Sequence, residues 1–150
     1  MTEYEMITRL VVALVLGALI GIERVHAGKS AGIRTLALVA LGSALFVVIS
    51  ENIVASYNFD VDPLRMAANI VTGVGFLGAG MIIFKGNSLS NLTTAAGVWV
   101  ADAIGMASGF GMYSIAITVT VLVIITFTVM WNLENYLKKK FGKEITTDSH

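Results

Sequence analysis

An aspartate inside an apolar stretch is the residue of this sequence with the clearest chemical potential. Asp102 lies in a run from Leu92 to Met112 that carries no other charge. A helix rises about 1.5 Å per residue, so Asp102 lies ~12 Å beyond Thr94, near the middle of a bilayer that the run would span. An ionised carboxylate there costs about 2.5–3.5 kcal/mol on insertion scales, so a cation, water or a proton must offset it. Two interpretations stay open: a cation or proton site, or a neutral aspartate hydrogen-bonded to a Thr or Ser of a neighbouring helix.

A second candidate site is the charged junction after the first apolar run. Glu23 and Arg24 end that run, and Arg34 precedes the next one. Interfacial charges of this kind ordinarily set membrane topology, but a carboxylate beside two arginines also predicts charge-assisted hydrogen bonds. We expect these ion pairs to lock the turn between the first two helices.

A third group of candidates is acidic and lies around the connection between the second and third apolar runs. It consists of Glu51, Asp60 and Asp62. Mg²⁺ prefers oxygen ligands and keeps several of its waters, so a wet pocket of these acids would suit it. Acids in a loop are also ordinary solvent-facing residues, and Glu51 could instead pair with Arg65. Apart from Mg²⁺ as a possible ligand, we expect no cofactor.

The elements that must position these residues are long apolar segments. The chain is 56% hydrophobic and 13% charged, whereas a soluble domain is about 25% charged. We therefore predict an all-α integral membrane protein, a compact bundle of five transmembrane helices. The expected spans are residues 6–22, 35–57, 64–84, 92–108 and 112–131.

Charge is segregated between the connections and predicts the orientation. The first connection is basic, the second is acidic, and the chain ends in Lys138, Lys139, Lys140 and Lys143. Lys and Arg are retained on the cytoplasmic side during insertion, so we expect the N-terminus outside and the C-terminus inside. This divides the chain into a transmembrane domain, 1–136, and a basic cytoplasmic tail, 137–150. The formal net charge of zero gives no indication of nucleic-acid binding.

Small residues predict where helices touch. Spacing of four places small residues on one helix face, where they let backbones approach closely in lipid. The predicted packing positions are Gly17 and Gly21 in the first span, Gly73, Gly75 and Gly78 in the third, and Gly97, Ala101, Gly105 and Gly109 in the fourth. The first and fourth faces would also offer surfaces for a homodimer or for a partner's helix. The third set matches the dinucleotide motif G-x-G-x-x-G, but an apolar run without a preceding strand favours helix packing.

Spans one–two and three–four form two helical hairpins of the same orientation. Each ascending helix begins near a threonine, Thr35 or Thr94. A parallel internal repeat would explain this similarity. Cysteine is absent and no hydrolase, metalloprotease or phosphate-loop motif occurs, so we expect no enzymatic activity.

Four ordered motifs give the chain a resemblance to the MgtC/SapB family of bacterial inner-membrane proteins. They are residues 16–24, 31–42, 62–80 and 92–105. The resemblance covers the transmembrane part, and many family members add an ACT-like cytoplasmic domain after it. Glu23, Arg24, Arg34, Thr35 and Thr94 match family motifs directly, whereas an acid at Asp102 departs from the family pattern.

The resemblance implies a multi-pass protein of the bacterial inner membrane that acts in Mg²⁺ limitation, acid stress or virulence. It would do so by binding and regulating other membrane proteins, with the lipid bilayer as its surroundings and a homodimer as a possible state. The alternative is a small Mg²⁺ or H⁺ transporter that uses Asp102 and Glu23.

Overall fold

The computed structural model describes residues 1–57, 62–85 and 88–141 of the chain. Its helices are α1 (Glu3–His26), α2 (Ile33–Tyr57), α3 (Pro63–Met81), α4 (Leu92–Gly109) and α5 (Tyr113–Phe141). A short antiparallel hairpin of β1 (Ile83–Lys85) and β2 (Ser88–Ser90) joins α3 to α4. The predicted all-α membrane class is confirmed, with this hairpin as an addition.

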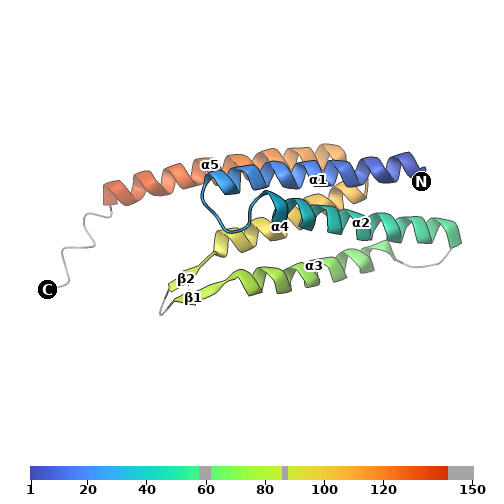
Figure 1. Ribbon diagram of the computed structural model, residues 1–150, viewed down its shortest axis with the longest axis horizontal. Helices are drawn as coiled ribbons and strands as arrows, with labels where there is room; N and C mark the ends of the chain where they lie inside the picture. Colours follow the sequence, from blue (N-terminus) through green and yellow to red (C-terminus); the bar gives the residue numbers. More distant parts are fainter. Residues whose placement is uncertain (58–61, 86–87, 142–150) are drawn as a thin grey trace.

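The five helices form an elongated bundle in which neighbours along the chain run in opposite directions (Figure 1). α1 and α4 both pack against α2, and α5 packs against α1 and α4. α3 lies at the edge, with most of its contacts to α4 and fewer to α2. One end of the bundle carries the α1–α2 loop, the β-hairpin and the end of α5, and the other carries the N-terminus (Figure 1).

Helix length and composition agree with a membrane location. α1, α2 and α5 are each long and apolar enough to cross a bilayer. α3 has 19 residues and α4 has 18, which gives lengths of ~27–29 Å beside a hydrocarbon core of about 30 Å. That these two shorter helices also span the membrane remains a prediction.

The connection between α3 and α4 differs from the expected one. α3 ends at Met81, before the predicted residue 84, because β1 and β2 pair with Ile83 opposite Ser90. Asn91 stands at the N-cap position of α4, but it makes no side-chain cap bond and takes a left-handed φ of 68°. Its amide instead donates to the Met81 carbonyl at 3.2 Å, which closes the base of the hairpin.

α5 is longer than the sequence suggested. It continues without a break past residue 131 and across the expected domain boundary at 136, as far as Phe141. Its C-terminal end projects beyond the other helices (Figure 1). The side chains of Trp131 and Tyr136 are exposed there, as expected for residues at a membrane interface.

The centre of the bundle is the contact of α1 and α4 with the backbone of α2. A Cβ added at Gly17 would lie 2.5 Å from the Leu36 carbonyl oxygen, and one at Gly105 would lie 2.7 Å from Ala40 Cα. Gly21 and Gly109 meet α2 in the same way, near Ile33 and Ala44. Ala101, in the same stripe of α4, is fully buried.

These contacts correct one expectation. The small-residue faces of α1 and α4 are not open to a partner, because α2 already occupies them within the chain. Gly97, the first residue of the α4 stripe, faces the Phe127 ring of α5 instead of α2, with its Cβ position 3.1 Å from that ring.

The glycines of α3 divide into two kinds. Gly78 is buried near Ala95 of α4. Gly73 and Gly75, which the sequence placed between helices, are exposed, with nothing within 4 Å of their Cβ positions. The prediction that these two positions pack inside the chain is wrong, because α3 lies at the edge of the bundle.

Replacing Gly105 by alanine should lower the stability of the fold by about 1–3 kcal/mol, because the added methyl group meets α2 backbone that cannot move aside. Thermal unfolding in detergent, followed by circular dichroism, measures the change. Gly75→Ala is the matched control: its methyl group enters open space, and we expect an unchanged or slightly raised melting temperature. Equal effects of the two substitutions would contradict this packing.

Candidate functional site

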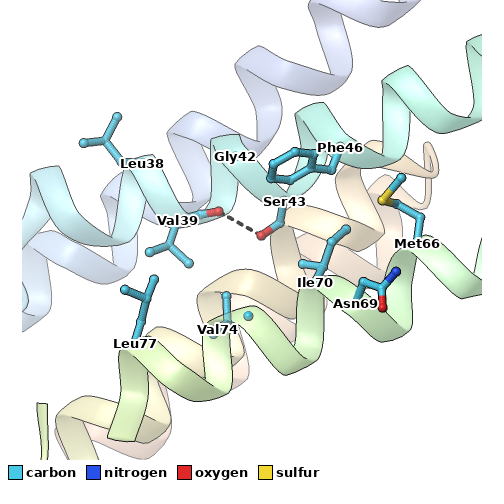
Figure 2. Close-up of a pocket in the computed structure, with 11 residues that line it drawn as sticks. Leu38, Val39, Gly42, Ser43, Phe46, Met66, Asn69, Ile70, Val74 and Leu77 are labelled. Carbon is cyan, nitrogen blue, oxygen red and sulfur yellow. Dashed lines mark hydrogen bonds between the residues drawn. The ribbon is translucent and has the colours of Figure 1, made fainter. Parts of the chain in front are cut away.

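Asp102 lies in the core, with 1% of its surface exposed. Its Oδ1 is hydrogen-bonded to the hydroxyl of Ser43 on α2. The same hydroxyl lies 2.9 Å from the Val39 carbonyl oxygen, one helical turn earlier (Figure 2). Asp102 Oδ2 is buried and has no hydrogen-bond partner. The structure therefore places a serine of a neighbouring helix beside the intramembrane acid. This is the arrangement that the interpretation as a hydrogen-bonded aspartate required.

The hydrogen count of this cluster is informative. A serine hydroxyl donates one hydrogen, yet Ser43 Oγ lies within bonding distance of two acceptors, Val39 O and Asp102 Oδ1. Both contacts are hydrogen bonds only if Asp102 supplies the second hydrogen. A protonated Asp102 would also remove the cost of a buried charge. Both hydrogen bonds of this cluster are therefore satisfied when Asp102 carries a proton, and not when its carboxylate is ionised.

Ser43 also lines a groove between α2 and α3, with a volume of about 520 Å³. Figure 2 shows its apolar walls, with Leu38 and Phe46 on α2 and Leu77 on α3. These three side chains are 51–64% exposed, so the groove opens on the outer surface of the bundle. Apart from Ser43, the polar side chain that lines it is Asn69. A surface of this chemistry suits an apolar occupant with room for one or two hydrogen bonds.

The charged junction at the end of α1 forms a separate cluster. Arg24 is 3% exposed, donates from Nη1 to Glu23 Oε2 at 3.3 Å, and stacks on Phe127 with 4.1 Å to the ring centroid. Its Nε is buried without a partner. The structure therefore contains an ion pair between Glu23 and Arg24, whereas Arg34 is exposed at the start of α2.

The remaining candidates do not join these two clusters. Thr94 is buried in the first turn of α4, and Thr35 is exposed in the first turn of α2. Gly21 packs against the start of α2, and Ser43 lies ten residues further along, so the junction and Asp102 are separated by about 15 Å along the bundle. Glu23 and Asp102 consequently belong to different sites.

The acidic candidates near the opposite end are arranged differently from the expected metal pocket. Glu51 forms an ion pair with Arg9 of α1, not with Arg65. Arg9 also donates to the Gly109 carbonyl at 2.7 Å and so ties together α1, α2 and α4. Asp60 lies outside the described residues, and Asp62 is exposed. Within the described part of the chain, no three acidic or histidine side chains converge as a metal site would require.

Three functional partners escaped the sequence analysis. Ser43 is a small polar residue in an apolar run and carries little signal by itself. Arg9 does carry one, because a basic residue inside an apolar span needs a counter-charge. Phe127 covers the Arg24 guanidinium. In the sequence it is one of many apolar residues in the last helix, so nothing there indicates this contact.

Comparison with known proteins gives a consistent result. The profile of the MgtC family matches residues 10–136. The chain is 41% identical over 140 residues to the "Putative magnesium transporter YhiD" of Escherichia coli K12, covering 91% of this chain and 65% of that protein. It is 46% identical over 112 residues to Protein MgtC of Brucella abortus, covering 75% of this chain and 45% of that protein. The chain thus spans less than two thirds of the length of these relatives. No solved structure matches it.

Replacing Ser43 by alanine should destabilise the protein by about 1–3 kcal/mol, because it leaves the whole carboxyl group of Asp102 without a partner in the core. Thermal unfolding in detergent measures the loss. The matched control is Ser108→Ala, an equally buried serine whose hydroxyl bonds only its own helix at Ile104, with an expected loss below about 1 kcal/mol.

A double-mutant cycle tests the contact itself. In an Asp102→Ala background, Ser43→Ala should cost about 1–2 kcal/mol less than in the original chain, because the acid that needs the hydroxyl is gone. Additive effects would contradict a direct interaction between the two side chains.

Proposed function

This chain belongs to the MgtC family, and from that premise we propose that it binds and regulates other membrane proteins of the bacterial inner membrane during Mg²⁺ limitation, acid stress or virulence. The observation that carries the proposal is the open side of the bundle between α2 and α3. The small-residue faces of α1 and α4 are used inside the chain, whereas the groove and the outer face of α3 are not covered by any described residue.

The groove favours a transmembrane helix as its occupant. Its walls are apolar side chains of α2 and α3, and at its floor Ser43 offers a hydroxyl. Beside it, α3 exposes a stripe of small residues: Ala68, Thr72, Gly75 and Ala79. Small residues at spacings of four, three and four let a second helix approach closely, and a polar side chain in the contact adds a hydrogen bond. A regulator that acts inside the membrane needs such a surface.

The charge at the bundle ends supports the proposed orientation. Arg24, Lys29 and Arg34 lie at the end that also holds the last turns of α5, with Lys139 and Lys140 (Figure 1). Glu3, Glu5 and Glu51 lie toward the other end. By the positive-inside rule we place the basic end in the cytoplasm and the N-terminus outside. No enzymatic step is part of this proposal.

Filling the groove should abolish partner binding without unfolding the protein. Gly73 lines the groove and has nothing within 4 Å of its Cβ position, so Gly73→Leu adds a side chain there without an internal clash. Because the chain has no cysteine, Leu38→Cys places a single crosslinking thiol on the groove wall. In cell membranes we expect Leu38→Cys to crosslink a partner protein, and Gly73→Leu to remove that crosslink.

Two controls make the result specific. Thr118→Leu adds bulk at an exposed position of α5, away from α3, and Leu122→Cys places the thiol on a similarly exposed part of α5. In parallel, each variant is expressed in a strain that lacks the protein, and growth of that strain in medium low in Mg²⁺ reports function. Retained growth and crosslinking in Gly73→Leu would reject the groove as the binding surface. A crosslinked second copy of this chain would replace a foreign partner by a homodimer.

Ion transport is the second candidate, and Asp102 favours it. A buried carboxyl group with an unpartnered oxygen is a default candidate for a proton or cation site within a membrane. The name of the Escherichia coli relative also connects that protein with magnesium transport. Against this, Glu23 lies about 15 Å from Asp102 along the bundle and is paired with Arg24.

Flux measurements separate the two candidates. We expect proteoliposomes that contain the correctly inserted protein to show no Mg²⁺ or H⁺ flux above empty vesicles, because Asp102 is sealed against Ser43. Asp102→Asn, which keeps the shape of the side chain, is measured beside it. A flux that disappears in this variant would make transport the primary function.

A further inference from the structure

A second pocket lies at the basic end of the bundle, between α4 and α5, with a volume of about 540 Å³. Its lining changes character along its length. Toward the middle of the bundle it is apolar, with Val100 of α4 and Val123 of α5. Toward the end it is polar, with Arg24, Lys29 and the hydroxyls of Thr93 and Thr126 among its lining residues. The groove proposed above lies elsewhere, between α2 and α3, so this pocket has no role in the proposed function.

Arg24 is the part of the pocket that indicates a ligand. A guanidinium has five N–H donors in a planar fork, and it is 3% exposed here. Among the described residues, its guanidinium has one hydrogen bond, to Glu23, and that bond is long at 3.3 Å. One face is covered by Phe127, and Nε is buried without a partner. Buried donors of a charged group are costly to leave unpaired. An anion in the pocket would satisfy them.

The surrounding charges favour an anion. The pocket also presents the ammonium group of Lys29 and one carboxylate, that of Glu134. Among the described side chains at this end of the bundle, five basic groups face two carboxylates. The basic groups are those of Arg24, Lys29, Arg34, Lys139 and Lys140, and the carboxylates are those of Glu23 and Glu134. The local excess is positive, and basic pockets between membrane helices hold lipid phosphates.

We propose that this pocket binds a phospholipid, with the phosphate group held by Arg24 and Lys29 and an acyl chain lying between α4 and α5. The planar fork of Arg24 matches two phosphate oxygens, and Lys29 adds a point charge at the rim. The apolar part at Val100 and Val123 has no use for a soluble phosphate but matches hydrocarbon. A basic part at the end of the bundle and an apolar part toward its middle match the headgroup and the acyl chain of a lipid at the membrane interface.

Trp131 makes the proposal measurable, because it lines the pocket and the chain has two tryptophans. Trp99→Phe leaves Trp131 as the sole fluorophore. The full chain with this change is purified in an uncharged detergent. Phosphatidylglycerol whose acyl chains are brominated close to the headgroup, at the level of Trp131, is then added in small steps. Bromine quenches tryptophan on contact, so an acyl chain in the pocket should produce quenching that saturates with added lipid.

Three further variants identify the phosphate contacts. Lys29→Gln changes an exposed residue and should raise the lipid concentration needed for half-maximal quenching about five-fold. Arg24→Gln should raise it about ten-fold or more, provided that circular dichroism shows an unchanged helix content. Lys140→Gln is the control: it removes an exposed charge at the same end that does not line the pocket, and the titration should not move.

The other outcomes overturn the proposal. Quenching that rises in proportion to lipid, alike in all variants, would mean that Trp131 only faces bulk hydrocarbon. Saturating quenching that Lys29→Gln does not weaken would exclude the assigned phosphate position, even if Arg24→Gln fails to fold. Inorganic phosphate at millimolar concentration should leave the quenching unchanged. If it reverses the quenching, the pocket binds a soluble phosphate instead of a lipid.

Discussion

The close approach of α1 and α4 to the backbone of α2 determines where every functional side chain of this protein lies. Lipid gives helices no hydrophobic reason to associate, so their contact depends on packing and hydrogen bonds. Gly17 and Gly105 provide the packing, and both meet the stretch of α2 from Leu36 to Ala40. With α4 held there, Asp102 meets Ser43. With α1 held there, Arg24 lies against α5, at Phe127.

α3 is the exception to this close packing, and the difference divides the molecule into two parts. The α1–α2–α4 core has its small residues turned inward, whereas α3 shows Gly73 and Gly75 outward and leaves a groove beside α2. The proposed function uses this difference, because it leaves a surface on which another helix could pack. α2 of this core supplies one wall of the groove, and α3 supplies the other.

The sequence predicts the helices well and their partners only in part. The long apolar runs predicted the order of the helices and the start of α3 within one residue, because these signals are local. The intervals of four in α4 predicted a buried face, but not that α2 would cover it. The pairs Asp102–Ser43 and Glu51–Arg9 join residues far apart in the chain. The outward position of Gly75 likewise depends on where α3 lies relative to the other helices. Such pairs depend on how the helices cross, which no local pattern encodes.

Ser43 has one more consequence, because its hydroxyl is at once a wall of the groove and the partner of a buried acid. An occupant that hydrogen-bonds this hydroxyl perturbs the contact in which Asp102 supplies the proton and Ser43 accepts it. Occupancy at the surface and the proton content of the core are then linked equilibria, and the coupling acts equally in both directions. A shift in proton supply would alter affinity in the groove, and a docked helix would alter the proton affinity of the core by the same factor.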